Sequence, residues 1–125
     1  MRTGHETILL VEPEEMLRSL TARVLQECGY TVMQASQPAE ALELIRREQQ
    51  PFHLLMTALE LPQGSGRELA EQVAGLRPDV RTLFTSADAG QLAAHPDGFG
   101  VPHALLRKPF TPEALSQRVR EVLET

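Results

Sequence analysis

The chain has 125 residues, the length of one ordinary domain that can bury a hydrophobic core. Its formal net charge of -5 at pH 7 argues against a nucleic-acid backbone as partner. It contains no tryptophan, one tyrosine and four phenylalanines, which argues against a surface that stacks single-stranded bases.

Membrane and secretion signals are absent from the sequence. No apolar run approaches the roughly 20 residues needed to span a bilayer. Residues 1–6 lack the apolar segment of a signal peptide. The single cysteine, Cys28, cannot form an internal disulfide and fits a reducing compartment. We therefore expect a cytoplasmic single domain over 1–125, with a core from about 7 to 123 and a loose lead-in over 1–6.

The first third of the chain alternates apolar runs with helical patterns. Thr7–Val11 and Thr31–Ala35 have strand character. Proline and acidic residues after the first run suit a helix start, and Gly29 suits its end. The apolar positions expected on the inner face of this helix are Leu17, Leu20, Val24 and Leu25. A second helix is predicted from Ser36 and Pro38 to residues 49–51, with Ala41, Leu42 and Ile45 as its apolar stripe.

A nearly continuous apolar run follows at His53–Thr57. Such a run is typical of a strand buried on both faces of a parallel sheet. The chain then turns through Pro62 and two glycines, which predicts a loop. Ser65 and Glu68 match the capping box of a third helix. Its inward positions are predicted to be Leu69, Val73 and Leu76, and it ends before Pro78.

The last third contains two further strands and a long helix. Val80–Ser86 and His103–Arg107 are predicted strands, and Ala89–Ala94 is a predicted short helix between them. The turn residues at 95–98 then break that short helix. Thr111 and Pro112 start the last helix. Its apolar face is predicted to consist of Leu115, Val119, Val122 and Leu123.

Five strands that alternate with helices predict an α/β fold with a parallel sheet covered on both faces. Right-handed crossovers favour a flavodoxin-like (βα)5 arrangement, a doubly wound five-stranded parallel sheet in the order 2-1-3-4-5. In such sheets, ligand chemistry gathers at the carboxyl ends of the strands. The residue best placed for chemistry after the third strand is Ala58, whose methyl group can neither ligate nor attack.

Four segments of the chain resemble, in order and spacing, the signature blocks of the response-regulator receiver domain. They read LLVEPEE, LLMTALELPQGSG, LFTSA and LLRKPFTPEAL. The resemblance extends from about Thr7 to Leu123, and the last block is especially similar to receivers fused to hybrid histidine kinases. It implies a module of two-component signal transduction and phosphorelay. In that family an aspartate after the third strand accepts a phosphoryl group from a kinase histidine, beside a magnesium ion.

The resemblance also assigns family positions to residues of this chain. A pair of acids after strand one holds the magnesium ion together with the acceptor. A hydroxyl after strand four and a lysine after strand five bind the phosphoryl oxygens, and an aromatic residue before that lysine switches its orientation. These positions fall on Glu12 and Pro13 for the acids, Ala58 for the acceptor, Ser86 for the hydroxyl, Lys108 for the lysine and Leu105 for the aromatic.

The departures from the family pattern remove phosphoryl chemistry. Alanine has no nucleophilic atom, so covalent phosphoryl transfer at Ala58 is excluded. Magnesium takes about six oxygens, and Glu12 without a second carboxylate would bind it weakly. His5, His53, His95 and His103 have no spacing that gathers a metal. We therefore expect no catalytic residue, no enzymatic activity, no cofactor, and weak or absent magnesium binding.

Three remaining polar residues each have two interpretations. We expect Lys108 to pair with Glu12, and the alternative is that it binds an anion. We expect Ser86 to satisfy nearby backbone groups rather than to bind a ligand. Glu60, two residues after Ala58, is expected to be a solvated loop acid. Its alternative role is a permanent substitute for phosphate that faces Lys108.

These observations predict a degenerate receiver, or pseudo-receiver, that acts through protein–protein interaction. A histidine kinase or an adjoining signalling domain is the expected partner. The resemblance implies a contact surface formed by the fourth helix, fifth strand and fifth helix, which would also serve a homodimer. Two alternatives stay open. One is a receiver phosphorylated at a non-standard residue such as Ser86 or Glu60, and the other is a module that binds phosphate or another anion near Lys108.

Overall fold

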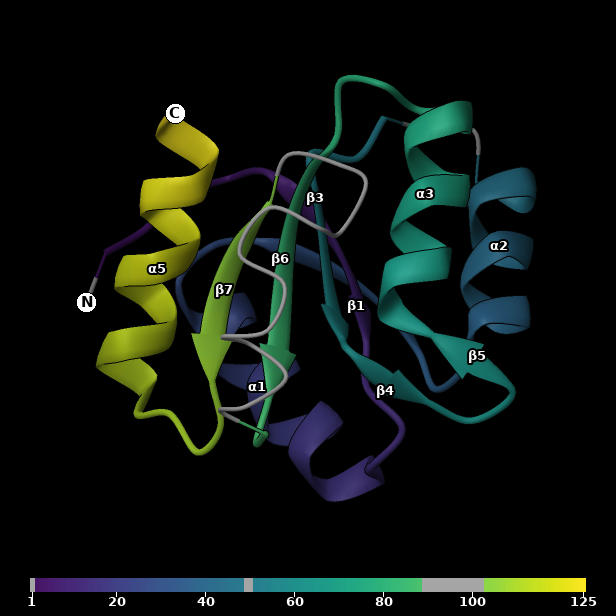
Figure 1. The fold of residues 1–125 in the computed structure, drawn as a ribbon. Helices are drawn as coiled ribbons and strands as arrows, with labels where there is room; N and C mark the ends of the chain where they lie inside the picture. The colour runs from purple at the N-terminus through teal and green to yellow at the C-terminus, as the bar shows by residue number, and fades with distance from the viewer. Residues whose placement is uncertain (1, 49–50, 89–102) are drawn as a thin grey trace.

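A five-stranded parallel sheet forms the centre of the part of the chain that the structure describes (Figure 1). The structure is a computed structural model that describes residues 2–48, 51–88 and 103–125. The strands of the sheet are β1 (Thr7–Val11), β2 (Thr31–Ala35), β3 (Leu54–Ala58), β6 (Arg81–Ser86) and β7 (Ala104–Arg107). Their order is β2-β1-β3-β6-β7, which confirms the predicted flavodoxin-like order 2-1-3-4-5.

Helices cover both faces of the sheet (Figure 1). Helices α1 (Glu15–Glu27) and α5 (Pro112–Glu124) pack on one face, and α2 (Pro38–Arg47) and α3 (Gly66–Leu76) pack on the other. Successive side chains of a strand point to opposite faces, so β3 supplies both layers. Leu54 and Met56 enter the core under α1 and α5, and Leu55 enters the core under α2 and α3. This two-sided burial is the reason that the run is continuously apolar.

The predicted helix ends are formed by side chains and by glycine. Ser65 Oγ accepts the backbone N–H of Glu68 at 3.1 Å, which confirms the predicted cap of α3. Thr111 caps α5 in the same way, by accepting the backbone N–H of Ala114 at 3.0 Å. After α1, Gly29 takes a φ of 102°, in the left-handed region where glycine is favoured.

Two leucines predicted to point inward are exposed. Leu20 is 55% exposed because the buried face of α1 is centred on Thr21 and Leu25, and Leu20 lies off that face. Leu76 is 54% exposed. It is the last residue of α3, and the next residue, Arg77, extends its guanidinium to the backbone carbonyl of Ile45. The spacing of the apolar residues predicted both helices correctly. It did not predict that Leu20 on α1 and Leu76 on α3 are exposed.

The prediction of a loose lead-in is wrong for residues 2–6. The backbone N–H of Gly4 donates to the carbonyl of Cys28 at 3.0 Å. The guanidinium of Arg120, on α5, donates to the carboxylate of Glu6 at 2.6 Å, and both side chains are largely buried. This hydrogen bond lowers the pKa of Glu6 from 4.5 to about 2. The N-terminal segment is therefore bound to the last helix.

Two other predictions concern the connections between strands. The segment after β3 was predicted as a plain loop, but it contains a small antiparallel hairpin of β4 (Glu60–Leu61) and β5 (Gly64–Ser65). Its strands have two residues each, too short for a sequence pattern to indicate. The predicted helix over Ala89–Ala94 lies outside the described residues.

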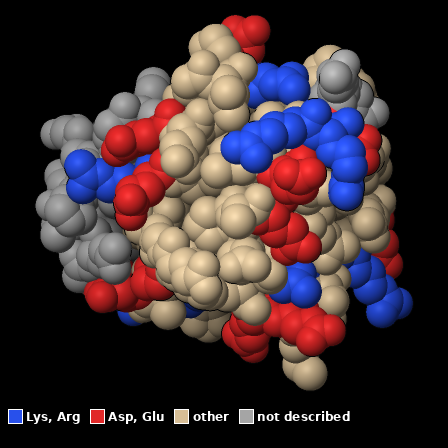
Figure 2. All heavy atoms as spheres, turned by 90° about the vertical axis from the view of Figure 1, so that its right-hand side faces the viewer, with Lys and Arg blue, Asp and Glu red and all other residues tan. Residues whose placement is uncertain are grey.

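The surface over α2 and α3 carries both signs of charge. Figure 2 shows this face, with acidic and basic side chains beside one another and apolar or neutral atoms between them. Arg46 lies 3.9 Å from Glu43 on α2, and Arg67 lies 3.4 Å from Glu71 on α3. This face has no continuous basic field of the kind that binds a phosphate backbone. Among the described residues, no helix has the length and apolar character that would cross a bilayer.

Candidate functional site

The sequence-predicted site residues meet at the carboxyl edge of the sheet. Ala58 ends β3, Ser86 ends β6, and Glu12 and Lys108 follow β1 and β7 directly. The strand register brings these ends together, because Ala58 lies beside Thr85 and Ser86 lies beside Arg107. The arrowheads of β3, β6 and β7 accordingly point to one edge in Figure 1. Such an edge is where ligands bind in open α/β sheets.

A short ion pair occupies one side of this edge. Lys108 Nζ lies 2.6 Å from Glu12 Oε1, with side chains that are 20% and 6% exposed. Glu12 Oε2 accepts the backbone N–H of Glu14 at 3.0 Å. The carbonyl of Glu12 accepts a guanidinium N–H of Arg18 at 2.9 Å. The predicted pairing of Lys108 with Glu12 is confirmed, and both carboxylate oxygens of Glu12 already have partners.

A second polar contact joins Glu60 to Ser86. Ser86 Oγ lies 3.0 Å and 3.1 Å from the two carboxylate oxygens of Glu60, to which it donates its single hydroxyl proton. Ser86 is fully buried, and its Oγ accepts the backbone N–H of Asp88 at 3.0 Å. The expectation of local backbone bonding is met only for this accepted bond. The expectation of a solvated Glu60 is met in part, because the residue is exposed while its carboxylate also accepts the buried hydroxyl of Ser86.

The β4–β5 hairpin places Glu60 at this position. Glu60 pairs with Ser65 across the hairpin, and Gln63 takes a φ of 59° in its turn. The backbone N–H of Gly66 donates to the carbonyl of Leu59 at 2.8 Å. A Cβ on Gly66 would lie 2.1 Å from the carbonyl oxygen of Ala58, so glycine is required for this close approach. The glycines after Pro62 are the sequence signal that indicated a tight turn here.

The residues at the expected acceptor and switch positions are apolar. Ala58 is 2% exposed and belongs to the core under α2 and α3. Leu105, on β7, is partly buried against the same core. Its backbone carbonyl accepts the guanidinium N–H of Arg118 at 3.1 Å. Neither side chain has a polar atom that could hold a phosphoryl group or report its presence.

The residues present do not fit a magnesium ion. Ala58 and Pro13 supply no side-chain oxygen, and both oxygens of Glu12 are engaged. Magnesium requires near-ideal octahedral oxygen coordination, usually with one or two carboxylates. Over residues 2–48, 51–88 and 103–125, no cluster of three or more His, Cys, Asp or Glu side chains could hold a metal ion.

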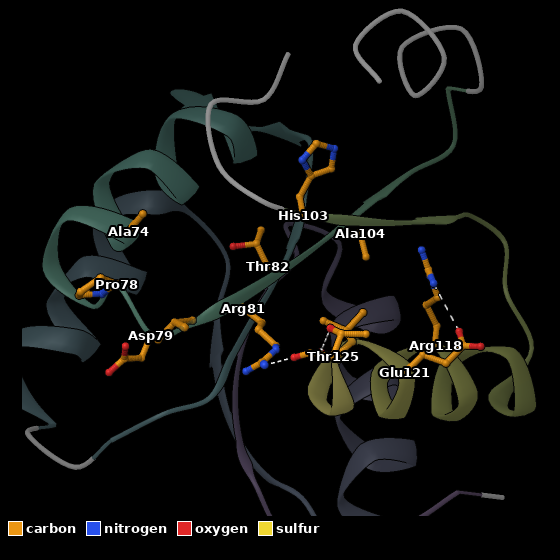
Figure 3. Close-up of a pocket in the computed structure, with 12 residues that line it drawn as sticks. Ala74, Pro78, Asp79, Arg81, Thr82, His103, Ala104, Arg118, Glu121 and Thr125 are labelled. Carbon is orange, nitrogen blue, oxygen red and sulfur yellow. Dashed lines mark hydrogen bonds and ion pairs between the residues drawn. The ribbon is translucent and has the colours of Figure 1, made fainter. Parts of the chain in front are cut away.

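A large cavity lies away from this site. It has a volume of about 710 Å³ and lies among the amino ends of β6 and β7, the end of α3 and one face of α5 (Figure 3). Its arginines are already bound within the chain. Arg81 donates to the backbone oxygen of Thr125, and Arg118 lies 3.3 Å from Glu121. None of the predicted site residues lines this cavity.

Comparison with known proteins places these features in a family. The family described as "Response regulator receiver domain" matches residues 8–120. The chain is 32% identical over 117 residues to the "Response regulator receiver protein CpdR" of Brucella abortus (strain 2308), covering 93% of this chain and 95% of that protein. It is 31% identical over 122 residues to the "Sensor kinase CckA" of the same organism, covering 98% of this chain but 13% of the kinase.

Solved structures give the same result for the fold. A CheY-like response regulator receiver domain protein from Methanospirillum hungatei JF-1 has a TM-score of 0.83 and 26% sequence identity. The similarity covers 97% of this chain and 95% of that one. The family match spans nearly the whole chain, and the sheet order is that of a flavodoxin-like fold. This chain belongs to the response regulator receiver domain family.

Proposed function

We propose that this chain is a pseudo-receiver, a signalling module that is not phosphorylated and acts through protein–protein contacts. The observation that carries the proposal is Ala58. It ends β3 at the acceptor position of the family and has no nucleophilic atom. Its methyl group is buried in the core and offers no oxygen that could accept a phosphoryl group.

The electrostatics of the site support the same proposal. Phosphoryl transfer relies on positioning and on cations that neutralise developing charge. The ammonium group of Lys108 is already neutralised by Glu12, and the residues for a metal ion are missing. We therefore propose that the chain has no enzymatic activity of its own, requires no cofactor, and binds magnesium weakly or not at all.

The partner in this proposal is a protein of a two-component system. The relatives include a sensor kinase and a receiver protein, which supports a histidine kinase or an adjoining signalling domain as partner. The proposed contact surface includes β7 and α5, and the expected fourth helix of this surface lies outside the described residues. A homodimer through this face and a cytoplasmic location are further parts of the proposal.

The proposal is tested by treatment with acetyl phosphate and magnesium, followed by intact-mass measurement. A receiver domain that keeps its acceptor aspartate, treated in parallel, is the positive control. The expected result is no added phosphoryl group on this chain while the control is modified. A stoichiometric addition would overturn the proposal, and peptide mapping would then locate it. An addition on Ser86 or Glu60 would establish the alternative of a non-standard acceptor.

A further inference from the structure

The hydroxyl of Ser86 has both of its hydrogen-bonding roles filled by the chain itself. It donates its proton to the carboxylate of Glu60 and accepts the backbone N–H of Asp88. A hydroxyl has one proton to donate, so Ser86 has no donor left for an external anion. The negative charge beside Ser86 is the carboxylate of Glu60, which belongs to the chain itself.

Both sides of this contact are held by regular structure. Glu60 lies in the β4–β5 hairpin, where it pairs with Ser65. Ser86 is the fully buried last residue of β6, and its carbonyl accepts the backbone N–H of Lys108 at 2.9 Å. Hydrogen bonds to an ionised acceptor are about twice as strong as neutral ones. The contact therefore connects three segments: the hairpin after β3, the start of the segment after β6, and the end of β7.

We propose that Glu60, Ser86 and the backbone N–H of Asp88 form a latch that holds Ala87 and Asp88, the two described residues after β6, in one arrangement without any bound group. We call these three groups the carboxylate latch. This inference rests on the proposed function, in which the chain is not phosphorylated. In a receiver that is not phosphorylated, the carboxylate latch makes the arrangement at this edge permanent rather than conditional. A partner that contacts this edge therefore meets one arrangement of Glu60, Ser86 and Asp88.

The test uses Glu60→Ala, Ser86→Ala and the double variant, compared with the unmodified chain by NMR. Amide hydrogen exchange and relaxation dispersion are measured at Ala87, Asp88 and Lys108. Glu71→Ala is the matched control, because it removes an exposed acid of α3 that has no contact with Ser86. Thermal melting and the dispersion of the amide spectrum establish that each variant is folded.

The expected result is slow exchange and flat dispersion profiles in the unmodified chain and in the control. Each single latch variant should exchange the Asp88 amide roughly tenfold faster or more, with millisecond motion at the same three residues. The double variant should add little to Ser86→Ala, because Ser86→Ala already removes the hydroxyl that Glu60 contacts. Unchanged exchange in folded Glu60→Ala, additive effects, or millisecond motion already present in the unmodified chain would overturn the carboxylate latch. Acetyl phosphate is absent from this experiment, so its outcome is independent of the phosphorylation test.

Discussion

Lys108 Nζ and Glu12 Oε1 lie 2.6 Å apart and join the ends of β7 and β1, although β6 and β3 lie between these strands in the sheet. Ala58 ends one of the two intervening strands and is a small residue. The ion pair therefore occupies the edge of the sheet at which ligands bind in open α/β folds. It also satisfies both charged groups that the family pattern retains at this edge.

Glu12→Gln should destabilise the chain, because it leaves the largely buried ammonium of Lys108 without its carboxylate. The expected loss in the free energy of unfolding is about 1–3 kcal/mol. Urea denaturation measures it. A double-mutant cycle with Lys108→Met serves as the control, and the double variant should lose less than the sum of the single variants. Additive losses would show that the two side chains do not interact in solution.

Magnesium at millimolar concentration should leave the melting temperature unchanged. A site with a tenfold excess of ion over its dissociation constant would add about 1.4 kcal/mol. For a domain of this size that would raise the midpoint by about 3–6 °C. Differential scanning calorimetry with and without the ion makes the comparison, with potassium chloride at matched ionic strength as the control. A saturable rise would reveal a metal site around Glu12.

Ala58→Asp alone should not restore efficient phosphorylation by acetyl phosphate. The change supplies a nucleophile, but Pro13 still leaves the metal one carboxylate short. The double change Pro13→Asp with Ala58→Asp should gain both magnesium affinity and phosphorylation well above the single variant. Intact-mass time courses of the two variants, run side by side, provide the measurement. Equal phosphorylation would mean that Pro13 is irrelevant and that the loss rests on Ala58 alone.

Two glycines of α3 should respond in opposite ways to alanine. A Cβ on Gly66 would lie 2.1 Å from the backbone oxygen of Ala58, so Gly66→Ala should cost about 1–3 kcal/mol. A Cβ on Gly75 meets nothing within 4 Å, so Gly75→Ala should stabilise the helix by about 0.5–1 kcal/mol. Chemical denaturation of both variants compares them directly. A neutral Gly66→Ala would mean that the backbone contact between α3 and β3 is loose.

Acid should weaken the chain through Glu6. Its folded-state pKa is lowered from 4.5 to about 2, chiefly by the hydrogen bond from Arg120. A depressed pKa contributes stability that is fully present above pH 4.5 and is lost as the pH falls toward 2. The contribution is roughly 2–3 kcal/mol. Unfolding free energies measured from pH 6 to pH 2 should fall less steeply in Glu6→Gln. An identical pH dependence in this variant would exclude Glu6 as a source of acid sensitivity.

The fold, and the presence of an alanine at the end of the third strand, could be predicted from the sequence alone. The continuously apolar run before Ala58 can be satisfied only where both faces of a strand are buried, and this placed it at the centre of a parallel sheet. Capping residues such as Ser65 and Thr111 act on backbone groups a few residues away, so their role can be predicted from spacing. The alanine at position 58 is a chemical fact that requires no structure.

Two other side-chain pairs could be found only from the packed elements. Ser86 and Glu60 are 26 residues apart, and Arg120 and Glu6 are 114 residues apart. Their contacts depend on a two-residue hairpin and on the packing of the last helix against the N-terminal segment. Local patterns depend on near neighbours in the chain, whereas a side-chain hydrogen bond depends on distances and angles that exist only after the elements have packed. For this reason the sequence predicted a solvated Glu60 and a loose N-terminus, and folding gave both of them partners.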